Sequence, residues 1–473
     1  MRSVGYTFCV LALATACGSG SAASSGGGGS GAPADAGSGS VPPIGAGPAD
    51  SGTSADAGAG STPPGDAGTG IADAGSDADA GAVADAGSSD AGAGGSDGGT
   101  ASTDCDGLVP STLPATIIHS ENLSQQIDGQ FCGVPQGNGH GFVAYAATND
   151  SQASWTILSP TGTPQGTVGA HSGDLFPAPS GFIGYGGSSA SQTVAILGYD
   201  DVGTLLNNTP FTGDAVYALN PNGGLFAAGQ LTPETVATSL DSTQVVFMFN
   251  ADGSVRYGPV PLGTNAAIFG AGVDRVGLAV VILDGTKTFG PGAISAIWFD
   301  AVGARLTPEF EVLHDFVPGV STWFETSALA GSGLALRRMD TAATDPTGEI
   351  LSSRWLALLP SGSESLDAAP AWLRSRPNTN LKLVRGGRAY ALFPWAALLS
   401  SCEQTVEILS PSGASCGKLS FVVDGKACTS RELRIGFDGT VMQMLPTERE
   451  TDLCPVRCDI QSCTLRYWPA ALR

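Results

Sequence analysis

Cysteine is the residue type whose number and spacing offer the most chemistry in this chain of 473 residues. Ten cysteines are present, and two of them, Cys9 and Cys17, lie close to the N-terminus. An even number of the remaining cysteines indicates disulfide bonds if the chain is exported. These disulfide candidates stand near the two ends of the remaining chain: Cys105, Cys132, Cys402, Cys416, Cys428, Cys454, Cys458 and Cys463. The spacing alone leaves their pairing open.

Metal binding is the other chemistry that clustered cysteines offer. Cys454, Cys458 and Cys463 follow one another at short intervals, but the set contains no Cys-x2-Cys pair and has no histidine nearby. Structural zinc sites are built on such pairs and histidines. We therefore predict no metal site and no cofactor.

Catalytic motifs are scarce. The chain has no Gly-x-Ser-x-Gly, no His-Glu-x-x-His and no Walker loop. Ser415 and Lys418 fit Ser-x-x-Lys, but strand-like residues surround them where that motif needs a helix N-terminus. The histidines are scattered along the chain: His119, His140, His171 and His314. We assign no catalytic residue from the sequence.

The N-terminus has the pattern of an export signal. Arg2 supplies a positive charge, and an apolar segment follows over residues 4–14. Small residues then precede Cys17, as a signal peptidase requires. We predict a signal peptide over residues 1–16.

The residues Ala14-Thr15-Ala16-Cys17 resemble a bacterial lipobox, although Leu13 stands one place before the leucine of that family. The resemblance implies that the Cys17 thiol receives a diacylglycerol and that this cysteine becomes the new N-terminus. A membrane-anchored lipoprotein, on the outer membrane or the cell surface, is the predicted location. Ordinary secretion, with Cys17 incidental, is the alternative.

Residues 17–103 are predicted to form a disordered tether. After Cys17 the segment consists almost entirely of Gly, Ala, Ser, Asp, Thr and Pro, and Asp-Ala-Gly occurs seven times at irregular spacing. Almost no large apolar side chain is present to offset the entropy of ordering the backbone. A Gly-rich chain of this length spans roughly 50 Å. The irregular aspartates do not have the fixed offsets of a calcium loop.

The charge excludes two classes of partner. The net charge is −22, of which Arg2 contributes +1, the tether −10 and residues 104–473 the remaining −13. A nucleic-acid binder needs clustered positive charge, and so does a protein that docks on anionic lipid through a basic patch. We therefore expect no nucleic-acid partner, and membrane contact only through the lipid anchor.

Residues 104–473 repeat one sequence pattern seven times: a glycine, an apolar run, a polar loop, a second apolar run and a turn. The first runs follow Gly141, Gly181, Gly224, Gly277, Gly333, Gly387 and Gly439, at intervals of 40, 43, 53, 56, 54 and 52 residues. The second runs are residues 155–158, 194–197, 245–249, 294–299, 355–359, 406–409 and 465–468.

These runs are short, rich in β-branched and aromatic residues and bounded by Gly, Pro, Asn and Asp, which predicts strands. Apolar residues at consecutive positions indicate that both faces of each predicted strand are buried. Two inner strands and a weaker strand on each side make a four-stranded antiparallel unit. Seven units predict an all-β fold, a seven-bladed β-propeller, for residues 104–473. Two β-sandwich domains are the alternative, but such domains would not be expected to repeat a common sequence pattern.

The turns Ser159-Pro160-Thr161-Gly162 and Ser410-Pro411-Ser412-Gly413 resemble those of TolB-type propeller repeats. This resemblance covers single turns, so it implies an architecture and no activity.

The ends of the repeat region predict how the ring closes. The last repeat lacks a fourth strand, whereas residues 108–125 precede the first repeat and contain the strand-like segment 115–118. We expect this segment to pair with the last strand, around residues 465–468, because closure removes an open sheet edge. The cysteines at both ends of the region would then cross-link the closure.

The anchor, the tether and the absence of a catalytic set favour a non-enzymatic, monomeric propeller that binds an extracellular protein or glycan. A propeller enzyme acting on glycans, as a hydrolase or lyase, is the first alternative. Its acids would converge from different blades, and the candidates in the longer inter-strand stretches are Glu325, Asp340, Glu349 and Glu403. A structural protein of the cell envelope is the second alternative.

Overall fold

The computed structural model describes residues 103–473 except 124–130, 149–152, 172–174, 189–192, 234–243, 317–319, 343–349, 362–368, 395–402, 423–432 and 450–458. The predicted signal peptide, Cys17 and the tether up to residue 102 therefore lie outside the described residues. Helix is limited in the described part to η1 (Thr103–Cys105), α1 (Thr286–Phe289), α2 (Ala371–Arg374) and η2 (Arg385–Gly387). No described helix is both long enough and apolar enough to span a membrane.

The described strands form six antiparallel sheets. In the order of hydrogen-bonded neighbours, the first contains β1 (Ile117–Asn122), β27 (Asp459–Trp468), β26 (Val441–Arg449) and β25 (Arg434–Ile435). The second contains β2 (Phe131–Cys132), β4 (Val143–Thr148), β5 (Ala153–Leu158) and β6 (Pro164–His171), with β3 (Gln136–Gly137) also on β4. The third contains β13 (Val255–Pro261), β12 (Val245–Phe249), β11 (Leu225–Pro233), β10 (Leu205–Leu219), β9 (Thr193–Tyr199), β8 (Gly181–Ser188) and β7 (Leu175–Ala178).

The other three sheets are smaller. One contains β14 (Ile268–Val273), β15 (Ala279–Asp284), β16 (Ala293–Phe299) and β17 (Phe310–His314). The next contains β18 (Val320–Ala328), β19 (Leu334–Ala342) and β20 (Ile350–Leu358). The last contains β21 (Thr379–Val384), β22 (Ala389–Pro394), β23 (Glu403–Leu409) and β24 (Ser415–Val422).

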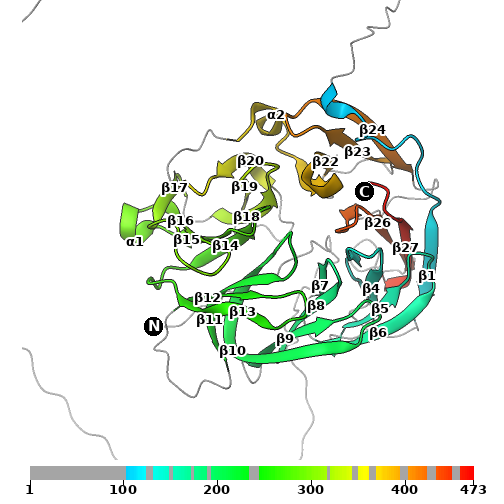
Figure 1. The fold of residues 1–473 in the computed structure, drawn as a ribbon, viewed down its shortest axis with the longest axis horizontal. Coiled ribbons are helices and arrows are strands. Elements are labelled where there is room, and N and C mark those ends of the chain that lie inside the picture. The colour runs from blue at the N-terminus through cyan, green and yellow to red at the C-terminus, as the bar shows by residue number, and fades with distance from the viewer. Residues whose placement is uncertain are drawn as a thin grey trace, which may run out of the picture. The chain divides into compact units, whose positions relative to one another are not determined.

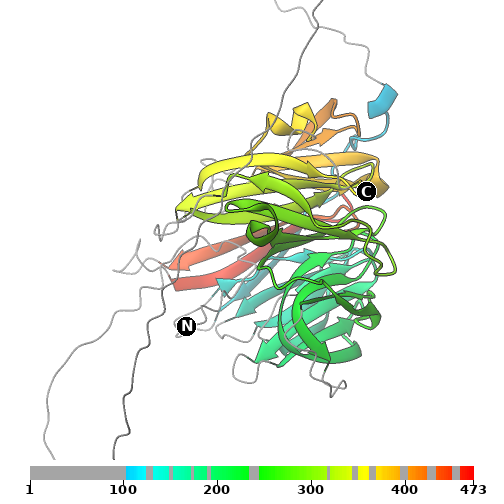
Figure 2. The ribbon, with the colours of Figure 1, turned by 90° about the vertical axis from the view of Figure 1, so that its left-hand side faces the viewer.

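The sheets follow one another around a centre (Figure 1), and a side view shows successive sheets packed face to face (Figure 2). Sequential antiparallel sheets in this arrangement define a β-propeller, as predicted. All seven predicted strand pairs are present: β4–β5, β8–β9, β11–β12, β15–β16, β19–β20, β22–β23 and β26–β27. The sheets number six because β10 pairs with β9 and with β11, joining two repeats. Seven blades therefore remain a prediction.

Strand β16 shows why the predicted runs are apolar without alternation. All seven of its residues are buried. Ile297 and Phe299 pack into a core shared with the β10–β13 strands, whereas Ile294 and Trp298 pack into a core shared with β19 and β20. A sheet that packs on both faces needs apolar residues at consecutive positions. Two separate sandwiches would leave the outer faces of their sheets exposed.

The ring closes as the sequence predicts. Strand β1 pairs with β27, with Ile117 opposite Tyr467 and Asn122 opposite Ser462. Figure 1 shows the first described strand, in cyan, beside the last strand, in red. The pairing begins two residues later than expected, at Ile117 rather than Ala115, and it extends further along the chain.

Candidate functional site

Two disulfides join the beginning of the propeller to its end. Cys105 is bonded to Cys416, and Cys132 is bonded to Cys463. These pairs confirm that cross-links join the two ends of the ring, and such bonds persist outside the reducing cytoplasm. Because Cys463 is bonded to Cys132, it is not available to bind a metal together with its neighbours in the sequence. The remaining disulfide candidates lie outside the described residues: Cys402, Cys428, Cys454 and Cys458.

Two of the four candidate acids are described with their side chains, and these two do not converge on one site. Glu325 and Asp340 both belong to the β18–β20 sheet, but they lie on opposite faces of it. Glu325 accepts a hydrogen bond from the buried Arg337, which also donates to the Thr379 carbonyl over 2.9 Å. Arg337 therefore ties two neighbouring sheets together, because Thr379 belongs to β21.

The other two candidate acids cannot be placed at a site. Glu349 lies outside the described residues, and Glu403 begins β23 with a side chain that is not described.

The scattered polar candidates have structural partners. Ser415 donates to Glu407 over 2.7 Å and lies in a strand, which confirms that the Ser-x-x-Lys match has no helix behind it. The histidines also lie apart. The contacts are His119 Nε2 to Tyr145 (2.7 Å), His140 Nδ1 to Asp201 (2.7 Å) and His314 Nδ1 to Glu311 (3.1 Å), while His171 ends β6.

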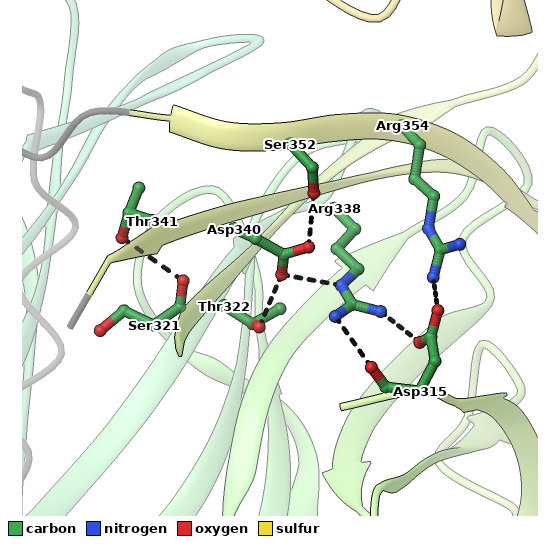
Figure 3. Close-up of polar contacts among 8 residues, drawn as sticks. All are labelled: Asp315, Ser321, Thr322, Arg338, Asp340, Thr341, Ser352 and Arg354. Carbon is green, nitrogen blue, oxygen red and sulfur yellow. Dashed lines mark hydrogen bonds and ion pairs between the residues drawn. The ribbon is translucent and has the colours of Figure 1, made fainter. Parts of the chain in front are cut away.

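A chain of polar contacts on the other face of the β18–β20 sheet forms the candidate site (Figure 3). Its inner part is Asp340, which accepts hydrogen bonds from Ser352 Oγ (2.6 Å), Thr322 Oγ1 (2.8 Å) and Arg338 Nε (2.9 Å). These residues come from all three strands of the sheet. The three donors fix the Asp340 carboxylate, which in turn fixes the Arg338 guanidinium.

The outer part of the chain is Asp315, which follows β17 on the neighbouring sheet. Its Oδ1 accepts from Arg338 Nη1, and its Oδ2 accepts from Arg354 Nη2. The Arg338 side chain is only 4% exposed, whereas those of Asp315 and Arg354 are 49% and 45% exposed. We call Asp340, Arg338, Asp315 and Arg354 the arginine–aspartate chain; it runs from a carboxylate that is 15% exposed to a half-exposed guanidinium.

Both carboxylates of this chain favour the ionised form. Burial on its own would raise the pKa of Asp340, but hydrogen bonds from Ser352, Thr322 and Arg338 outweigh it and hold the pKa below its usual value. Burial opposes the same effect at Asp315, where hydrogen bonds from Arg354 and Arg338 lower the pKa. Neither group suits a general acid, which must hold a proton near neutral pH.

The exposed end of the chain borders a cavity of about 380 Å³. The lining residues are Leu313, His314, Asp315, Arg354, Trp355, Leu356 and Arg374. The cavity therefore combines apolar walls with two guanidinium groups, one imidazole and one carboxylate. Its size is in the range that small-molecule sites occupy, and its positive groups can bind an anion.

Sequence reasoning singled out Asp340 but missed its partners, because the members of the site come from separate segments of two sheets. One signal was visible: Arg337 and Arg338 stand next to each other inside an otherwise apolar run. Two adjacent strand residues point to opposite faces. Two buried arginines there imply an acidic partner on each side, and Glu325 and Asp340 provide it.

Comparisons with known proteins add no family. No family model matches the chain, and no curated protein matches its sequence. Among solved structures, a prolyl endopeptidase is 10% identical with a TM-score of 0.37, over 71% of this chain and 50% of that one. A streptogramin B lyase is 10% identical with a TM-score of 0.34, over 74% and 97%. A virginiamycin B lyase from Staphylococcus aureus is 9% identical with a TM-score of 0.34, over 74% and 99%. This chain thus spans half of the peptidase, and these likenesses concern architecture alone.

Proposed function

We propose that this protein is a lipid-anchored, extracytoplasmic β-propeller that binds an acidic glycan without transforming it. The observation that carries the proposal is the position of Arg354 at the rim of the 380 Å³ cavity. Its Nη2 donates to Asp315, and the described residues show no hydrogen bond from its other nitrogen atoms. A guanidinium held in one orientation, with donors to spare, is suited to a ligand carboxylate.

Preorganisation distinguishes this arginine from an ordinary surface cation. An isolated exposed ion pair contributes little, because the side chains must be ordered for it. Here the order comes from the buried part of the arginine–aspartate chain, where Arg338 is held by Asp340 and holds Asp315. Folding therefore already orders the Arg354 side chain, so that binding a ligand does not have to supply the free energy for this ordering.

The low pKa of Asp315 and of Asp340 supports binding rather than acid catalysis at this cavity. Arg374 adds a second guanidinium to the lining, and Leu313 and Leu356 add apolar surface. A sugar with a carboxylate presents both an anionic group and an apolar ring face. A uronic acid is therefore the ligand class that matches the lining best.

Anchoring through Cys17 is the second part of the proposal. The two disulfides support export, because such bonds persist outside the reducing cytoplasm, and the lipobox-like residues before Cys17 support the anchor. Globomycin, which blocks the lipoprotein signal peptidase, should make a lipid-modified precursor accumulate. Normal processing under globomycin, or membrane retention of Cys17→Ser, would contradict the anchor.

Isothermal titration with a galacturonate oligomer and its neutral galactose counterpart tests the binding site. We expect binding of the acidic oligomer only. Arg354→Gln should weaken it by roughly tenfold or more, since a charge-assisted hydrogen bond contributes about 1.5–3 kcal/mol. Arg256→Gln, at an exposed arginine on β13, is the matched control and should bind like the wild type. Equal binding by Arg354→Gln would contradict the site, and cleavage of the oligomer would contradict the non-enzymatic role.

A further inference from the structure

A second cavity, of about 470 Å³ and wide open to solvent, lies where the first described segment meets the C-terminal residues. The lining residues are Gly107, Val109, Pro110, Ser111, Thr112, Leu113, Pro114, Arg385, Pro469, Ala470, Ala471 and Arg473. The lining contains two arginines and no Asp or Glu side chain. It shares no residue with the cavity at Arg354, so it is a separate feature of the molecule.

Arg385 is the residue that gives this cavity its chemistry. Its Nε is buried and has no hydrogen-bond partner among the described residues. Burial lowers the pKa of Arg385, and the neighbouring charge of Arg388 adds to that effect. A partly buried cation beside another cation is an unfavourable arrangement until an anion neutralises it.

The backbone holds Arg385 in this position at a cost. Its φ is 56°, in the left-handed region that favours glycine, and Ala470 across the cavity has a φ of 50°. Among the described residues these are the two non-glycine positions with positive φ. Strained backbone of this kind concentrates where a structure positions groups for a ligand.

The walls of the cavity are fixed from both sides. On one side, the Cys105–Cys416 disulfide precedes Leu108, which is buried in the core, and Leu113 packs against the same core. On the other side, the Ala470 N–H donates to Thr440 Oγ1 over 2.9 Å. The cavity is therefore bounded by ordered structure.

We propose that this cavity binds the phosphate group of a ligand. The guanidinium of Arg385 is the principal donor, with Arg473 as a second cation and the hydroxyls of Ser111 and Thr112 within the same lining. Arginine pairs with phosphate oxygens through two parallel hydrogen bonds. Val109 and Leu113 in the same lining can contact the organic part of a phosphate ester, which is the ligand class we propose. This inference does not depend on the uronate site.

Thermal melting of the disulfide-intact propeller, titrated with inorganic phosphate at constant ionic strength, tests the proposal. A ligand that binds the folded state raises the melting temperature in a saturable way. We expect this effect in the wild type and in the Arg256→Gln control. Arg385→Gln should raise the dissociation constant by at least about tenfold.

A second variant separates binding from folding. Arg385→Gly removes the guanidinium but suits a φ of 56°, so it should melt within about 5 °C of the wild type without phosphate and lose the phosphate effect. Absence of a saturable effect in the wild type, or its persistence in both variants, would overturn the proposal.

A further arm identifies the source of the phosphate. Cosedimentation of Cys17→Ser protein with phosphatidylglycerol vesicles, abolished by Arg385→Gln and competed by free phosphate, assigns the site to a lipid headgroup. Stabilisation by glycerol 3-phosphate without vesicle binding assigns it to a soluble ester.

Discussion

Cys105 and Cys416 are 311 residues apart in the sequence, and a disulfide joins them with their Cα atoms 5.2 Å apart. Cys132 and Cys463 form the second bond, across 331 residues. Together the two bonds bracket β1, the strand that closes the ring. The Cys105–Cys416 bond therefore links the chain directly to β24 before the chain reaches β1.

The first prediction concerns that bond. Cys105→Ser combined with Cys416→Ser should lower the free energy of unfolding by about 2–5 kcal/mol, because it releases the loop that this bond closes, through Cys132–Cys463, in the unfolded chain. Urea unfolding measures the change. Deletion of residues 18–103 is the control and should leave the midpoint unchanged. An unchanged midpoint in the double variant would show that the bond has no role in stability.

The second prediction concerns closure. Deleting residues 104–125 removes β1 and leaves the edge of β27 open. The whole propeller should then unfold or aggregate, although the deletion removes no complete repeat. Calorimetry and light scattering would detect this. A C-terminal half that retained its own melting transition would instead indicate two independent domains.

The third prediction concerns pH. The folded-state pKa of Asp340 lies below the ordinary value of 3.8, so the carboxylate adds stability above that pH and loses it as the pH falls through the folded value. Asp340→Asn should destabilise the protein at neutral pH by about 1–3 kcal/mol. It should also flatten the pH dependence between about pH 5 and about pH 2. Urea midpoints across this range test it, and an unchanged slope would argue against an ionised Asp340.

The fourth prediction concerns the packing of neighbouring repeats. A Cβ added at Gly198 in β9 would overlap the carbonyl of Asp252, in the turn between β12 and β13. Gly198→Ala should therefore lower the melting temperature strongly, since such backbone contacts cannot relax. Gly331→Ala, where a Cβ meets nothing within 4 Å, is the matched control. Similar melting temperatures for the two variants would contradict this contact.

The strands and the closure of the ring could be predicted because short stretches of sequence indicate them. A glycine at the turn and an apolar run such as β16 are visible in one stretch of sequence. The continuity of β10 was not visible: Asn207, Pro210 and Gly213 suggest a break, but pairing with both β9 and β11 keeps the strand intact. Tertiary pairing overrides local propensity at such a position.

The candidate site could not be predicted in the same way. Arg338 and Arg354 come from neighbouring strands and Asp315 follows β17 on another sheet, so their partnership depends on how two sheets pack. The sequence shows only that charged residues interrupt an apolar run. Which acid meets which arginine is decided by register and packing between sheets, and neither is encoded in local spacing.

The most direct test of the proposed function is nuclear magnetic resonance of the arginine side chains, recorded on the disulfide-intact propeller labelled with 15N-arginine. Galacturonate disaccharide should shift the Arg354 Nε resonance in a saturable way and leave Arg256 in place, whereas the galactose disaccharide should shift neither. An Arg354 resonance that does not respond, or that responds equally to the neutral sugar, would contradict a uronate site at this cavity.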